Sequence, residues 1–204
     1  MSRLPLGDLE SALKDPTAYR KKIDTPQSTR FGQSYFGYLR IALLKYHDSK
    51  DIVDARRYLE ERLDGFKSAY KRSETLEQFD WYIDEYSRRG WPTFGTRLRI
   101  QVSLPNWTPD DLRCSGEIPR IDIVPGEGYA AWLMKSREPA EWEQQLQMPL
   151  IQDTVAQLLK VPAEEVQVGI YSFHERFAAS RIYTFQEIEQ SHSALARLLK
   201  EMGY

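Results

Sequence analysis

The chain has 204 residues, of which 28% are charged and 41% hydrophobic, and its formal net charge is −2 at pH 7. This length suits one domain with a full-sized core, and the composition is ordinary for a soluble globular protein. The single cysteine excludes an internal disulfide and favours a reducing cytoplasm, and no apolar run is long enough to span a membrane.

Charge is distributed unevenly along the chain. Residues 1–110 contain 19 basic and 16 acidic side chains, which leaves 9 basic and 14 acidic ones for the remainder. The small net charge gives no general attraction to nucleic acid. The acidic second half by itself is a poor electrostatic footprint for tight DNA binding.

Residues 1–94 have the pattern of a helical region. A short apolar segment ends near Asp15-Pro16, and Pro16 suits the first position of the next helix. Three longer segments repeat apolar residues at helical spacing, and Gly65 and Gly90 follow the last two. We therefore expect helices over residues 6–13, 16–20, 32–47, 52–63 and 73–86.

From Thr96 onward the apolar period changes to two, which is typical of half-exposed strands. We expect strands over residues 96–104, 114–123, 128–135 and 166–173 and one ending at 181–183, with a helix over 138–160. Thr184, with Glu187 at capping-box spacing, should begin the last helix. The sum is one α/β domain over residues 1–204, with a helical part (1–94) and a mixed-sheet core flanked by helices (95–204).

The second half contains a hairpin, a helix and a further strand, in that order. The first strand of the hairpin contains Gly116 to Asp122, a Pro-Gly-Glu-Gly turn follows, and the second strand contains Tyr129 to Ser136. This layout resembles the RecB-like branch of the PD-(D/E)XK nucleases, which have a restriction-endonuclease-like fold. The opening with Asp15-Pro16 and Tyr19-Arg20 is also similar to the N-terminal helices of that branch.

The resemblance implies an active site whose metal ligands are missing. Phe36, Pro119 and Leu133 stand where the family has a histidine, an aspartate and a further acidic residue. Lys135 and Gln147 match the family lysine and glutamine, whereas Ile151 replaces a tyrosine. Magnesium is a hard cation that needs oxygen ligands, so we expect no metal and no cofactor at these positions.

A rebuilt metal site is the alternative to a lost one. Glu117 and Asp122 are carboxylates near the expected site, and Lys135 would complete a magnesium-dependent nuclease centre. Strand alternation argues against it, because Glu117 shares a face with Pro119 while Asp122 points to the other face. Pro119 itself predicts a bulge or a sheet edge, since proline cannot donate to a strand ladder.

A basic and aromatic segment is the candidate for nucleic-acid binding. Trp81 begins a run of aromatic residues, and Arg88, Arg89, Arg97 and Arg99 lie close to it in sequence. Single-strand binders stack bases on such aromatic rings between basic side chains. The structural alternative is a helix that packs its aromatic residues onto the sheet and directs its arginines outward.

The leading interpretation is a catalytically inactive RecB-like protein that binds nucleic acid or serves as a structural subunit. Its setting would be a prokaryotic-type DNA-processing or defence complex, with a helicase or another processing subunit as protein partner. An active magnesium-dependent DNA nuclease using Glu117, Asp122 and Lys135 is the second interpretation. An α/β protein unrelated to nucleases is the third, because a fold does not fix a function.

Overall fold

The structure is a computed structural model that describes residues 2–25, 34–104, 112–137 and 141–204. Short 3₁₀ helices cover Leu6–Asp8, Trp142–Gln144 and Ala163–Glu165. The helices are α1 (Leu9–Lys14), α2 (Pro16–Asp24), α3 (Tyr35–Ser49), α4 (Ile52–Leu63), α5 (Ala69–Arg89), α6 (Gln147–Leu159) and α7 (Phe185–Glu201). The strands are β1 (Ser2–Pro5), β2 (Thr93–Gln101), β3 (Leu112–Val124), β4 (Gly128–Lys135), β5 (Val166–Ser172) and β6 (Phe177–Arg181).

The six strands form one mixed sheet around the long strand β3. Its order is β1-β3-β4-β5-β6, and β2 pairs with β3 as well. Pairings β1–β3 and β4–β5 are parallel, and β2–β3, β3–β4 and β5–β6 are antiparallel. The structure therefore confirms an α/β fold in which a mixed sheet is flanked by helices and the first half is largely helical.

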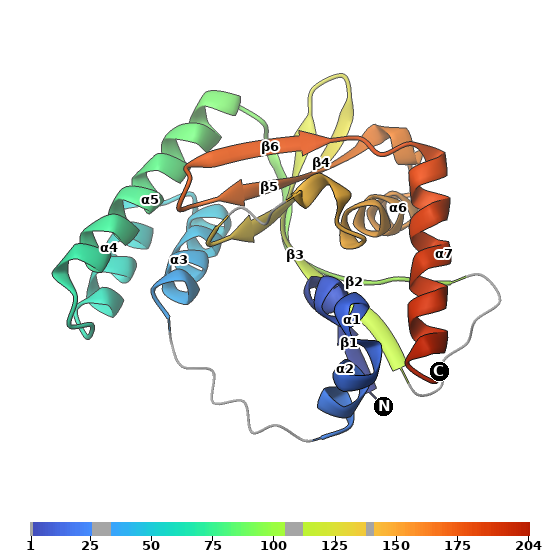
Figure 1. The fold of residues 1–204 in the computed structure, drawn as a ribbon. Helices are drawn as coiled ribbons and strands as arrows, with labels where there is room; N and C mark the ends of the chain where they lie inside the picture. Colours follow the sequence, from blue (N-terminus) through green and yellow to red (C-terminus); the bar gives the residue numbers. More distant parts are fainter. Residues whose placement is uncertain (1, 26–33, 105–111, 138–140) are drawn as a thin grey trace.

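Each face of the sheet has its own hydrophobic core. Helices α1, α2, α6 and α7 pack on one face, and α3, α4 and α5 pack on the other, so the two groups lie at opposite sides of Figure 1. Alternation along β4 serves both cores, because Ala131 and Leu133 enter the first while Ala130, Trp132 and Met134 enter the second.

The alternation of β3 changes phase at Pro119. Ile118 and Ile121 both enter the first core although they are three residues apart. The pairing of β2 passes over Pro119, since Thr96 pairs with Arg120 and Leu98 with Ile118. On the other edge of β3, β1 pairs with residues 112–115 and β4 with 120–124, so Pro119 lies in the gap between them. A residue without an N–H fits this unpaired position, as its type predicts.

Several boundaries differ from the sequence predictions. Strand β1 was not expected, because four residues carry no clear period and their partner is more than 100 positions away. The helix expected over 138–160 is shorter, since α6 begins at Gln147, and residues 138–140 lie outside the described part. Pro149 explains this start: its ring would clash with the Gln145 carbonyl in a helix that began earlier.

Strand β2 also lies about three residues earlier than expected. It covers Thr93–Gln101, whereas the expected range was 96–104. A register shift between Thr93 and Gly95 lets the strand continue pairing with β3 up to Asp122. The start of the helix expected at residue 32 lies outside the described residues, and α3 begins at Tyr35 within them. None of the helices formed by the described residues has the length and apolar character that a membrane crossing requires.

Candidate functional site

The positions implied by the nuclease resemblance, except Phe36, line one small cavity. It has a volume of about 200 Å³ and lies where β3 passes between β1 and β4. Among its lining residues are Glu117 and Pro119 from β3, Leu133 and Lys135 from β4, and Gln147 from α6. We call this the Lys135 cavity.

Two cations and one carboxylate set the electrostatics of the Lys135 cavity. Arg40 enters from α3, and its Nη2 lies 3.4 Å from Glu117 Oε1. Burial lowers the pKa of Lys135, the positive charge of Arg40 lowers it further, and Asp8 opposes the shift. Lys135 is half-buried and feels the positive charge of Arg40, so its surroundings favour an anionic ligand. Gln147 is buried, and its Nε2 donates to Gln145 Oε1 at 2.7 Å.

The residues around this cavity do not fit a magnesium site. Pro119 and Leu133 are apolar at the implied ligand positions, and Glu117 is engaged by Arg40. Asp122 does not line the cavity; it is fully buried, with its Oδ2 2.8 Å from Arg120 Nη2. The change of phase at Pro119 puts Glu117 and Asp122 on the same face of β3, so the expectation of opposite faces was wrong. The structure nevertheless does not bring Glu117 and Asp122 together. Within the described residues there is no group of three or more His, Cys, Asp or Glu that could hold a metal ion.

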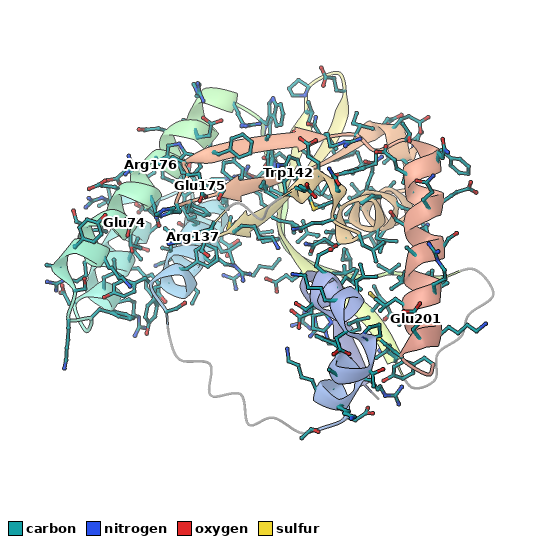
Figure 2. All side chains as sticks on the ribbon, in the orientation of Figure 1. Glu74, Arg137, Trp142, Glu175, Arg176 and Glu201 are labelled. Atoms are coloured by element: carbon teal, nitrogen blue, oxygen red, sulfur yellow. The ribbon has the colours of Figure 1, made fainter. Side chains whose placement is uncertain are left out.

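Phe36, at the implied histidine position, does not line the Lys135 cavity. Its ring contacts Phe173 at 5.7 Å between centroids, and it lines a separate cavity of about 370 Å³. Glu74 and Arg137 line the same separate cavity, and Figure 2 shows both near the end of the β5–β6 hairpin. Glu74 Oε1 lies 3.5 Å from Nδ1 of His174 there, so this carboxylate already has a partner.

The basic and aromatic segment is divided among several surroundings. Trp81 is half-buried, and its ring packs edge-on against Phe173 and Tyr171 in the second core. Arg88 and Arg89 both pair with Glu85 at the end of α5. The aromatic side of α5 thus packs onto the sheet. The sequence had allowed this packing as the alternative to base stacking by the same aromatic residues.

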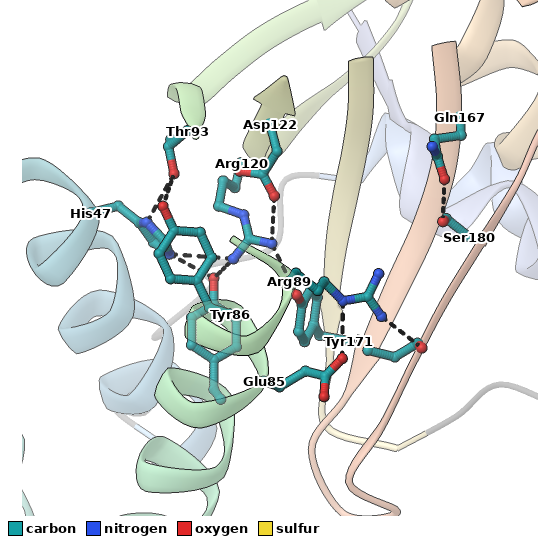
Figure 3. Close-up of polar contacts among 12 residues, drawn as sticks. His47, Glu85, Tyr86, Arg89, Thr93, Arg120, Asp122, Gln167, Tyr171 and Ser180 are labelled. Atoms are coloured by element: carbon teal, nitrogen blue, oxygen red, sulfur yellow. Dashed lines mark hydrogen bonds and ion pairs between the residues drawn. The ribbon is translucent and has the colours of Figure 1, made fainter. Parts of the chain in front are cut away.

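Arg89, Arg97 and Arg99 do not share one surface. The Arg89 guanidinium lies 4.7 Å from the Trp132 ring centroid and donates to the Ala178 carbonyl at 3.0 Å, so it connects α5 to the sheet (Figure 3). Arg97 has a left-handed φ of 53° and lies 3.6 Å from Asp48. Arg99 is exposed and lines a larger cleft on the solvent side of β1, β2 and β3.

A buried polar network is the site feature that the sequence did not predict. Arg120 is fully buried between the sheet and α5, pairs with Asp122, and donates to the Tyr171 hydroxyl at 3.1 Å (Figure 3). Four aromatic rings surround its guanidinium at 4.9–5.7 Å from their centroids, namely Tyr82, Tyr86, Trp132 and Tyr171. These contacts compensate the cost of burying a charge.

His47 extends this network to the edge of the second core. Its Nε2 lies 2.7 Å from the Tyr82 hydroxyl, and its Nδ1 lies 3.2 Å from Thr93 Oγ1, which contacts the Tyr86 hydroxyl at 2.9 Å. Burial lowers the pKa of His47 to about 2, and the charges of Arg120 and Lys50 add to the effect. The ring is therefore neutral, with Nε2 accepting from Tyr82 and Nδ1–H donating to Thr93.

The buried network lies apart from the Lys135 cavity and from the cleft at Arg99. Neither Arg120 nor His47 lines the Lys135 cavity or the cleft at Arg99. Its donors and acceptors join α3, α5, β2, β3 and β5, which are neighbours in the second core. It therefore fixes the position of the helices on the sheet.

Comparisons with known proteins give similarities to solved structures. No protein-family model matches the chain, and a comparison with curated proteins finds no match. Among solved structures the chain is similar to a protein from Eubacterium rectale named "Putative exonuclease". The two are 11% identical, the superposition covers 84% of this chain and 69% of the other, and the TM-score is 0.48.

Proposed function

We propose that the protein is a catalytically inactive, RecB-like nuclease-fold protein that binds nucleic acid as a subunit of a DNA-processing or defence complex. The observation that carries the proposal is the Lys135 cavity. Its lining includes Pro119, Leu133, Lys135 and Gln147, which the resemblance assigns to the active site. It also includes Arg40 and the carboxylate that Arg40 engages, Glu117. A helicase or another processing subunit would be the protein partner.

The donor set of the cavity explains the expected loss of cleavage. Magnesium-dependent phosphodiester hydrolysis uses carboxylates that hold the ion beside the scissile phosphate. Pro119 and Leu133 offer no oxygen ligand from their side chains, and Arg40 neutralises Glu117. What remains is Lys135 and Arg40, which suit contact with a phosphate oxygen and not activation of water.

A cleavage and binding assay on the purified protein tests this function. We expect no cutting of single- or double-stranded DNA with Mg²⁺ or Mn²⁺, and salt-sensitive binding of DNA at low ionic strength. Lys135→Ala alone should change affinity little because Arg40 remains, whereas Arg40→Ala with Lys135→Ala should weaken binding roughly tenfold or more.

Glu117 gives the discriminating variant. Glu117→Gln should strengthen DNA binding slightly, because it removes a negative charge from the wall of the cavity. Metal-dependent cleavage that disappears in Glu117→Ala would instead show an active nuclease and overturn the proposal.

A further inference from the structure

A wide cleft lies at the exposed side of β1, β2 and β3. It has a volume of about 680 Å³, within the range of roughly 300–1,000 Å³ that ligand sites span. Three exposed arginines line it, one from each strand: Arg3 from β1, Arg99 from β2 and Arg113 from β3. We call it the arginine cleft.

Strand pairing forces these arginines together. Arg3 is directly opposite Arg113 in the parallel pairing of β1 with β3. Arg3 Nε donates to Ser115 Oγ at 2.9 Å, which holds its guanidinium over the β3 side of the cleft. Arg99 is opposite Glu117 in the pairing of β2 with β3. Like charges opposite each other disfavour the pairing of Arg3 with Arg113, and a bound anion would relieve that repulsion. Arg99, by contrast, faces the opposite charge of Glu117.

The only carboxylate in the lining of the arginine cleft is Glu117, as far as the described residues show, and Arg40 binds it from the other side. None of the three arginines takes part in an ion pair within the described part of the chain. This contrasts with Arg88, Arg89 and Arg97, which each lie beside a carboxylate. Among the described residues, the arginine cleft thus has three arginines and one carboxylate in its lining, on a protein whose net charge is −2.

The arginine cleft adjoins the Lys135 cavity. Gly116 and Glu117 line both, so the two are neighbours along β3, and the Leu6 side chain packs against Gly116 at their boundary. The cations therefore follow a path from Arg99, Arg3 and Arg113 to Arg40 and Lys135. A path of this kind matches an extended polyanion better than a compact one.

We propose that the arginine cleft binds consecutive backbone phosphates of a single nucleic-acid strand whose end reaches the Lys135 cavity. The proposal rests on the proposed function, because it assigns the strand path to the same protein. Arginines contact the phosphates with charge-assisted, bidentate hydrogen bonds, and Gln101 and Ser115 add polar contacts. A single strand is favoured because the adjoining cavity, at about 200 Å³, has no room for a duplex.

The test is fluorescence anisotropy with a labelled 12-nucleotide single-stranded DNA and a duplex of the same length, at low salt. The test variant is Arg3→Gln, Arg99→Gln and Arg113→Gln together. Its matched control removes the same charge from exposed positions elsewhere, with Arg62→Gln, Lys67→Gln and Arg197→Gln. Circular dichroism and the thermal midpoint check that both variants fold, which exposed positions should allow.

We expect the test variant to lose roughly 100-fold or more in single-strand affinity while the control changes little. The slope of log K against log salt should fall by about 2, since each lost phosphate contact on a single strand accounts for about 0.7. The duplex should bind the parent protein more weakly than the single strand does.

The other outcomes separate the two proposals. Equal affinity of the test and control variants, with a parent that binds DNA, overturns the cleft assignment and leaves the proposed function standing. A parent that binds no DNA overturns both. Inorganic tripolyphosphate is the second arm: if it binds the parent through the three arginines and the DNA does not, the cleft takes a small polyphosphate and the strand path is wrong.

Discussion

Arg120 and His47 show how single buried polar residues stabilise the packing of the second core. A fully buried guanidinium is costly, and Asp122, two hydroxyls and four aromatic rings together compensate it. Because Arg120 is charged at every physiological pH, it also keeps the neighbouring imidazole neutral. The two residues therefore form one unit, in which the arginine donates to Tyr82 and the histidine accepts from it.

His47 makes stability depend on pH in a defined direction. Its pKa is about 2 in the folded protein and near 6.5 when unfolded, so the unfolded chain binds more protons between these values. The contribution of the neutral His47 ring to the free energy of unfolding is fully present above pH 6.5 and declines as the pH falls. Replacing His47 with Gln should remove up to about 1.4 kcal/mol per pH unit from the slope of unfolding free energy below pH 6.

Urea unfolding of the parent protein and His47→Gln at pH 4.5–7.5 measures this slope. A second measurement is the NMR titration of the His47 ring, which should show no midpoint above pH 4. A midpoint between pH 5 and 7, or identical slopes for the two proteins, would contradict the neutral buried imidazole.

At the scale of elements, the β3–β4 hairpin contains two glycines at positive φ whose surroundings differ. Gly126 has φ 79° and open space where a Cβ would be. Gly128 has φ 114°, and a Cβ there would lie 2.1 Å from the Glu165 carbonyl oxygen, at the end of the 3₁₀ helix before β5. The hairpin and the entry to β5 thus approach each other at Gly128 without room for a side chain.

Alanine at these two positions should separate backbone strain from crowding. Gly126→Ala should cost about 1 kcal/mol, because it places a side chain at positive φ. Gly128→Ala has the same kind of strain and a backbone clash in addition, so it should cost at least about 2 kcal/mol more. Chemical denaturation of the two variants provides the comparison, and equal losses would mean that the contact with Glu165 relaxes freely.

At the scale of the whole molecule, one sheet joins two cores. Strands β3, β4 and β5 send alternate side chains into both, so neither core can lose its packing without exposing the other face of the same strands. A chain of 204 residues with this arrangement should unfold as one unit, which is the single-domain prediction made from its length.

Tryptophan fluorescence can compare the two cores when single tryptophans are removed. Trp142 lies in the first core, whereas Trp81, Trp91 and Trp132 pack in the second. Trp142→Phe therefore leaves a signal weighted to the second core. Urea unfolding followed by fluorescence in Trp142→Phe and in Trp132→Phe, and by far-UV circular dichroism, should give midpoints that agree across probes within each variant. Separate midpoints for fluorescence and circular dichroism in one variant would indicate that the two faces unfold independently.

Local patterns predicted much of this molecule. Period-two alternation identified β3, β4 and β5, and Thr184 with Glu187 forms the capping box expected for α7. The residues implied by the nuclease resemblance, Lys135, Gln147, Pro119 and Leu133, do line one cavity. These features act over a few residues or follow from strand order, so the sequence alone contains them.

Only the tertiary structure determined the contacts between segments that are distant in sequence. Arg3 meets Ser115 across 112 positions, and Arg120 meets His47 across 73. Such meetings depend on strand register and helix placement, which local periodicity and turn residues do not specify. For this reason the sequence grouped arginines that are neighbours along the chain, Arg88 to Arg99. The pairing of both β1 and β2 with β3 instead gathered Arg3, Arg99 and Arg113 on one surface.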